Sequence, residues 1–128
     1  MTVETASRPA AGRVARSPRS AAAPSLGTED IDLTCFELVA QVGSARSSFV
    51  EAIDRAENGD FEGASDAMAE GDECFKAGHD VHMRLLAREA DGEQLPFRII
   101  LLHAEDLMAG AELLRIMAEK MIKLYQTR

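Results

Sequence analysis

The residues best suited to chemistry are a histidine and an aspartate in the last third of the chain, His103 and Asp106. On a helix, residues three positions apart project from the same face. An imidazole acts as a nucleophile, a proton carrier or a metal ligand near pH 7. The aspartate could orient that imidazole or bind a cation at an oligomer axis. In the structural alternative, the two side chains simply hydrogen-bond and pack within an interface.

The other two histidines, His79 and His82, form a second pair with the same spacing. His82 falls on the predicted core-facing side of its helix and His79 one position off it, which is more typical of packed histidines than of ligands. A metal-binding bundle built from His79, His82, His103 and Asp106 is a further alternative. The sequence has no Glu-x-x-His, H-E-x-x-H, G-x-S-x-G or glycine-rich phosphate-loop motif, which disfavours the enzyme classes that these motifs mark.

Three long amphipathic segments must position these residues. Apolar or small residues recur at alternating steps of four and three, as on a core-facing helix, over residues 30–57, 61–90 and 97–126. Turn signals separate the segments at Asn58-Gly59 and Asp91-Gly92. The spacing predicts an all-α fold, an up-down-up antiparallel three-helix bundle. The predicted seams are Ile31, Cys35, Leu38, Val42, Ala45, Phe49, Ala52 and Ala56; Phe61, Ala64, Met68, Gly71, Phe75, Gly78, His82 and Leu85; and Phe97, Ile100, Ala104, Leu107, Ala111, Leu114, Ala118, Met121 and Tyr125.

The first 27 residues differ in composition from the rest. They are rich in Ala, Ser, Arg and Pro and poor in large apolar residues, which predicts a disordered basic tail over 1–27. An organellar transit peptide has a similar composition and is the alternative. The helical domain is expected over 28–128, with Thr28 as an N-cap, Asp60 capping the second helix and Pro96 near the first turn of the third.

Composition narrows the function classes. A chain of 128 residues fits one domain, and 5% aromatic residues is low for a β-sandwich. The net charge of −8 is concentrated in the helical part, so nucleic acid is an unfavourable partner. No apolar run is long enough to span a membrane. The two cysteines, Cys35 and Cys74, have no metal-binding spacing, and we expect both in the core of a cytoplasmic protein.

The third helix has a second row beside its seam: Ile99, His103, Asp106, Gly110, Leu113 and Met117. A helix that is apolar on two sides is usually covered on two sides. We therefore expect an oligomer built around this helix, with His103 and Asp106 in or beside the covered face.

Several stretches, in order and without gaps, carry a family resemblance. Residues 35–40 and 43–47 (CFELVA and GSARS) resemble GFEIVAYAGDARS, 57–61 (ENGDF) resembles an inter-helix turn, His79 with 85–93 (LLAREADGE) resembles an AH…LL…EA-G-E run, and 103–106 (HAED) resembles the opening of HAQDHLM. These motifs belong to the IIA component of the lactose/cellobiose (N,N'-diacetylchitobiose) class of the bacterial phosphoenolpyruvate-dependent sugar phosphotransferase system. The resemblance covers about 100 residues, from Thr28 to the C-terminus.

The resemblance implies a phosphocarrier that serves uptake of a disaccharide of the lactose, cellobiose or chitobiose type. In that family the histidine of the last motif, here His103, accepts a phosphoryl group from phospho-HPr and passes it to a cysteine of the IIB component. The aspartate three residues later, here Asp106, lies on the threefold axis of a homotrimer, where three copies share one divalent cation, usually Mg²⁺. The membrane is reached only indirectly, through the IIC permease.

The chain departs from the family pattern close to the implied site. Glu105 replaces a glutamine, Leu107 replaces a second histidine and His82 replaces a glutamine on the preceding helix. Glu105 adds a negative charge beside a group that must accept a phosphoryl dianion. These changes keep a second hypothesis open: a non-catalytic helical binding or regulatory module that retains the trimeric fold.

Overall fold

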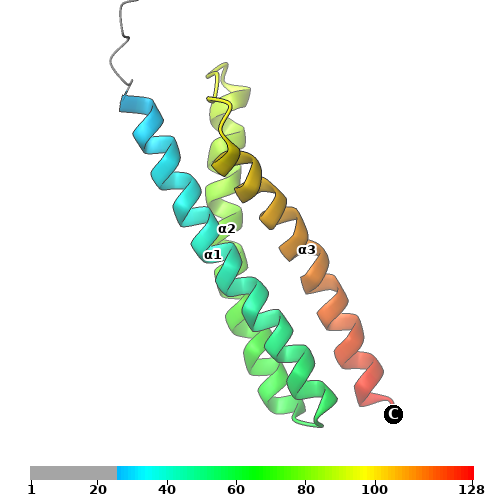
Figure 1. Cartoon of the computed structure of the whole chain (residues 1–128). Coiled ribbons are helices and arrows are strands. Elements are labelled where there is room, and N and C mark those ends of the chain that lie inside the picture. The colour runs from blue at the N-terminus through cyan, green and yellow to red at the C-terminus, as the bar shows by residue number, and fades with distance from the viewer. Residues whose placement is uncertain (1–25) are drawn as a thin grey trace, which may run out of the picture.

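Three helices make up the computed structural model, which describes residues 26–128 (Figure 1). They are α1 (Leu26–Glu57), α2 (Phe61–Ala90) and α3 (Ile99–Gln126), and no strand occurs in this described part. Helices α1 and α3 run in one direction and α2 in the other, as the sequence predicts for an up-down-up bundle. None of the three is both long and apolar enough to cross a membrane.

Helix α1 contributes a row of buried side chains to the core along most of its length. All eight residues of its predicted seam are buried, and the largest of them is Phe49. The seam packs against buried side chains of both other helices, among them Val81 on α2 and Ala104 on α3. The helix begins at Leu26, two residues before the predicted cap at Thr28. The predicted basic tail over 1–27 otherwise lies outside the described residues.

The turn between α1 and α2 follows the predicted signals. Gly59 has a φ of 79°, a left-handed conformation that favours glycine. Asp60 caps α2, because its side-chain Oδ1 accepts a hydrogen bond of 2.9 Å from the Gly63 backbone N–H. Further along α2, Gly71 and Gly78 are both buried against side chains of α1, so the two helices pack closely there.

Helix α3 begins later than expected. Its N-cap is Arg98, and Pro96 lies in the connection before the helix rather than in its first turn. Phe97 was predicted as the first seam residue, but it lies in this connection and 85% of its surface is exposed. From Ile100 onward, every predicted seam residue of α3 is buried or half-buried.

The three helices do not pack evenly. Both α2 and α3 contact α1 extensively, whereas α2 and α3 contact each other far less. Two arginines fix the end of the bundle that precedes His103. Arg98, at the start of α3, donates a hydrogen bond of 2.6 Å to Asp32 of α1, and Arg88 of α2 donates one of 2.9 Å to Asp30. Arg98 thereby ties the start of α3 to α1, and Arg88 ties the end of α2 to α1.

Candidate functional site

His103 lies in the second turn of α3 with its side chain exposed. The next residue, Ala104, is fully buried against α1 and α2. The backbone that carries His103 is therefore anchored by packing, while the imidazole remains accessible. Such a ring can meet the surface of another protein without any rearrangement of the helix.

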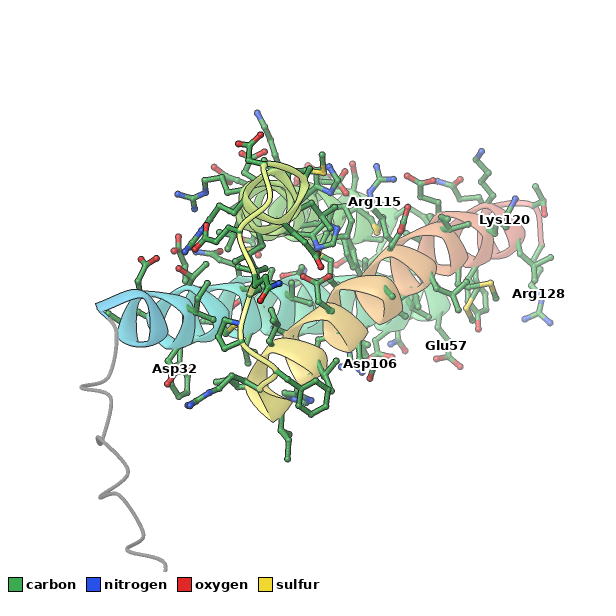
Figure 2. All side chains as sticks on the ribbon, turned by 90° about the horizontal axis from the view of Figure 1, so that it is seen from above. Asp32, Glu57, Asp106, Arg115, Lys120 and Arg128 are labelled. Carbon is green, nitrogen blue, oxygen red and sulfur yellow. The ribbon has the colours of Figure 1, made fainter. Side chains whose placement is uncertain are left out.

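Asp106 is also exposed, one turn further along α3 (Figure 2). Figure 2 shows it on the side of α3 away from Arg115, whose guanidinium binds Asp72 of α2 at 2.6 Å. Asp106 therefore lies on the outward face of α3. In this single chain no other helix covers the carboxylate.

The face around Asp106 is mostly apolar. Leu102 and Leu113, which flank Asp106 on this face, are 52% and 62% exposed. Ile99 and Met117, from the predicted second row of α3, are also exposed. The structure thus places the second row on the outside of the bundle, as an apolar face interrupted by one carboxylate.

The other two histidines lie on the opposite side of α3 from His103. His82 and His79 line a hollow of about 150 Å³ between α2 and α3, together with Glu105, Met108, Ala109 and Glu112. His82 Nδ1 lies 2.6 Å from Glu105 Oε2, with 21% and 34% of the two side chains exposed. The Nδ1 atom is shielded from solvent, and the ring N–H does not point along the line of a hydrogen bond to any partner in the described residues. The two side chains thus approach closely without the alignment of a hydrogen bond.

Two departures from the family pattern thus contact each other, which the sequence alone did not reveal. Residues two positions apart on an α-helix are about 200° apart around its axis, so Glu105 and His103 project in nearly opposite directions. His82 contacts Glu105 on that side of α3 and therefore does not contact His103 within the same chain.

The four-residue metal bundle considered from the sequence does not form within one chain. In residues 26–128, no three His, Cys, Asp or Glu side chains come together in a way that could hold a metal ion. The carboxylate of Asp106 is accordingly a single potential ligand on an open face.

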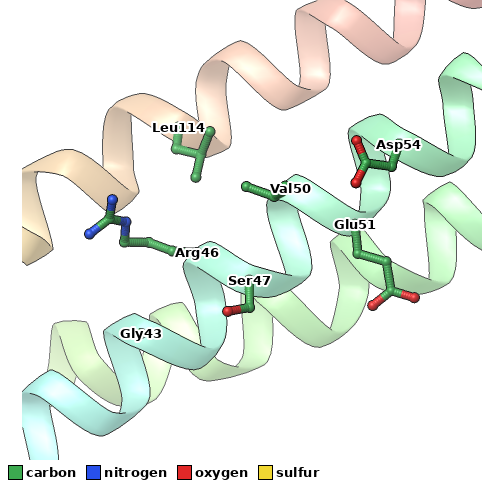
Figure 3. Close-up of a pocket in the computed structure, with 7 residues that line it drawn as sticks. All are labelled: Gly43, Arg46, Ser47, Val50, Glu51, Asp54 and Leu114. Atoms are coloured by element: carbon green, nitrogen blue, oxygen red, sulfur yellow. The ribbon is translucent and has the colours of Figure 1, made fainter.

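A larger hollow of about 560 Å³ lies between α1 and α3 (Figure 3). Val50 and Leu114 form its apolar part, and Arg46 and Ser47 are among its polar groups. His103 does not line it. This groove was not predicted from the sequence, because no periodic signal marks a space between two helices.

The pKa of the Cys35 thiol is influenced by the charge of Glu105. Burial raises the pKa of the Cys35 thiol, and the negative charges of Asp32 and Glu105 raise it further. Cys35 is buried and Cys74 half-buried, and neither forms a disulfide, as the sequence predicts. The Glu105 carboxylate is therefore close enough to the core for its charge to influence α1.

Comparisons with known proteins agree on one family. A family model described as the lactose/cellobiose-specific IIA subunit of the phosphotransferase system (PTS) matches residues 33–126. The PTS lactose-specific EIIA component of Lactococcus lactis subsp. lactis is 38% identical over 79% of this chain and 96% of its own length. The corresponding component of Staphylococcus aureus strain N315 is 33% identical over 79% of this chain and 98% of its own.

Two solved structures have the same fold. The PTS cellobiose-specific enzyme IIA from Bacillus anthracis superposes with a TM-score of 0.73 at 30% identity, covering 75% of this chain and 88% of that one. PtcA from S. mutans superposes with a TM-score of 0.74 at 28% identity, covering 77% and 96%.

Proposed function

This chain belongs to the lactose/cellobiose-specific IIA family of the sugar phosphotransferase system, and we propose that it carries a phosphoryl group on His103 between HPr and a IIB component. The observation that carries the proposal is the placement of His103. The imidazole of His103 is exposed, while Ala104, the next residue on the same helix, is fully buried. A carrier must meet two partners in turn, and an accessible nucleophile on an anchored helix fits that requirement.

The proposed transfer consists of two balanced displacements. A lone pair on the neutral His103 imidazole attacks the phosphorus of phospho-HPr, so that a nitrogen–phosphorus bond forms. The bond between phosphorus and HPr breaks, and its electron pair leaves with HPr. In the second step a cysteine thiolate of IIB attacks the same phosphorus. A sulfur–phosphorus bond forms, and the electron pair of the broken bond returns to the imidazole, which is then ready for another cycle.

The net charge of −8 is compatible with protein partners whose docking surface is basic, because surfaces of opposite charge attract each other. The transfer depends mainly on aligning the two reacting groups and on stabilising their charge. The sugar specificity remains at the level of the class, lactose, cellobiose or chitobiose, because the IIA component itself does not contact sugar in this scheme.

We also propose that three chains assemble through the outward face of α3, with Asp106 at the threefold axis. Support comes from the exposed apolar side chains around it, Leu102 and Leu113 among them. An exposed apolar face of this kind is typical of a surface that a partner covers.

A shared Mg²⁺ fits the donor chemistry of this face. A carboxylate oxygen is the kind of ligand that Mg²⁺ takes, but Mg²⁺ needs about six oxygen ligands, and a single chain offers only Asp106 here. Three symmetry-related carboxylates with water would supply the set. When bound, the cation would neutralise three carboxylates that otherwise repel one another.

The first experiment tests the phosphoryl acceptor. Purified chain is mixed with phosphoenolpyruvate, the general phosphotransferase enzyme and HPr, and mass spectrometry counts phosphates. Wild type is expected to gain one acid-labile phosphate per chain, and His103→Ala none. His79→Ala, which removes an exposed histidine of α2, should be labelled like wild type. An unlabelled wild type, or a labelled His103→Ala, would refute the assignment.

The second experiment tests the assembly. Light scattering of wild type should give the mass of three chains, and metal analysis one divalent cation for every three. Asp106→Leu should still assemble, because it extends the apolar face, but should bind no cation at the axis. A monomeric wild type at micromolar concentration would show that the outward face of α3 is not an interface.

A non-catalytic binding module is the second candidate, and it is favoured by the two departures from the family pattern near His103, Glu105 and Leu107. In that case the chain captures its partner equally well with His103→Ala, and no phosphate is found on the wild type. The same phosphorylation assay separates the two candidates.

A further inference from the structure

The contact between His82 and Glu105 has a consequence for the site on the far side of α3. Glu105 carries the negative charge nearest in sequence to His103. A free carboxylate there would repel an incoming phosphoryl group, which carries negative charge itself. In the structure the carboxylate is turned toward α2, where its Oε2 lies 2.6 Å from His82 Nδ1.

The surroundings of the pair favour a charge-neutralising role. His82 Nδ1 is shielded from solvent, so the Glu105 carboxylate rather than water is its close polar neighbour. Such a contact is attractive only when Nδ1 carries a proton, and it is strongest when the ring is an imidazolium. The other groups that face the pair are His79 on α2, Glu112 on α3 and the thiol of Cys35 on α1. None of these three supplies a fixed positive charge. The guanidinium of Arg98, which also acts on Cys35, is paired with Asp32 at 2.6 Å, so His82 is the group placed to balance Glu105.

We propose that His82 is a positioning residue for phosphoryl transfer: it holds the Glu105 carboxylate against α2 and, when protonated, neutralises it, so that His103 can accept a phosphoryl group. This inference rests on the proposed function. It assigns His82 an action through Glu105, without contact between His82 and the reacting atoms. It also explains why a glutamate is tolerated beside His103 in this chain.

The test measures the initial rate of His103 phosphorylation by phospho-HPr for wild type, His82→Gln, Glu105→Gln and the double variant. His82→Gln should slow the reaction about three- to tenfold at low salt, because Glu105 is then unbalanced. Glu105→Gln should react at least as fast as wild type. Adding Glu105→Gln to His82→Gln should restore the rate. The matched control is His79→Gln, since His79 has no carboxylate partner within 4 Å in the described residues.

A further readout separates this role from a structural one. The slowing by His82→Gln should shrink at about 0.5 M salt, because screening weakens the repulsion between Glu105 and phosphate.

Each outcome is decisive. If His82→Gln reacts as fast as His79→Gln, or if the double variant stays slow, or if the slowing is unchanged at about 0.5 M salt, the inference is wrong while phosphorylation of His103 stands. If both single variants slow the reaction equally and lower thermal stability together, the pair only ties α2 to α3. If wild type and Glu105→Gln both take no phosphate, the proposed function has failed, and the inference fails with it.

Discussion

Gly71→Ala should destabilise the bundle, because a buried ring occupies the space that a new methyl group would need. A Cβ added at Gly71 of α2 would lie 2.5 Å from Phe49 Cε1 and 2.7 Å from Phe49 Cδ1. Phe49 is fully buried and packs against Phe75 with ring centroids 6.5 Å apart. The ring therefore has no free direction in which to move.

Two effects of opposite sign determine the magnitude. Replacing a helical glycine with alanine gains about 1 kcal/mol of helix propensity. Forcing an extra methyl group into a packed core costs about 1–3 kcal/mol. Gly43→Ala provides the reference, because a Cβ at that helical position meets nothing within 4 Å. Both variants share the propensity gain, so the difference between them isolates the steric cost, about 1–3 kcal/mol.

Urea unfolding followed by circular dichroism, at one fixed protein concentration, measures this difference. Gly43→Ala should raise the unfolding midpoint and Gly71→Ala should lie well below it. Phe49→Leu combined with Gly71→Ala should show a smaller steric penalty than the separate effects predict, because the clashing ring atoms are gone. If Gly71→Ala stabilises the protein as much as Gly43→Ala, the packing of α1 against α2 differs from that described here.

Three further predictions concern a helix cap, an ion pair and the cysteines. Asp60→Ala should lower the free energy of unfolding by about 1 kcal/mol in urea titrations, because it removes the side-chain cap of α2; an unchanged midpoint would contradict the cap. Arg88 lowers the pKa of Glu93, so this pair stabilises the fold above the unfolded-state pKa of Glu93 and the contribution is lost as pH falls through the lower, folded-state pKa. Acid unfolding should therefore be less steep for Glu93→Gln than for wild type, and equal steepness would argue against the pair. In the native protein at pH 8, iodoacetamide should modify Cys35 more slowly than Cys74, since Cys35 is buried and its pKa is raised. Mass spectrometry of the digested protein measures the two rates, and faster modification of Cys35 would contradict its burial.

The sequence predicted the helices well where burial follows a simple period. The seam of α1 is the clearest example, because every one of its eight positions is buried. The prediction was wrong at Phe97, where an apolar residue next to Pro96 was counted into the helix although it precedes the N-cap Arg98. Apolar residues spaced three or four positions apart can by chance extend the pattern beyond the end of a helix. Only the backbone geometry shows where the helix begins.

The site could be predicted only in part, for a related reason. Placing His103 and Asp106 on α3 needs nothing beyond helical spacing and the resemblance. The contact of His82 with Glu105 depends on how α2 and α3 are rotated and shifted against each other. Patterns within one helix carry no information on that relation, so the two residues were noted separately and never as a pair. The proposed cover over Asp106 comes from other subunits, and the assembly experiment tests it.

The uneven packing of the bundle also has a consequence for how the protein folds. Helices α1 and α2 share an extensive interface and a short turn, so they have the features of a hairpin that forms early from local contacts. Helix α3 makes most of its contacts with α1, and its outer side remains exposed to solvent after it has packed against the other two helices. Its amides should therefore exchange with deuterium sooner than those of the hairpin in an isolated chain. In the proposed trimer, association of subunits would complete the last step of folding, and the stability of α3 would then depend on protein concentration.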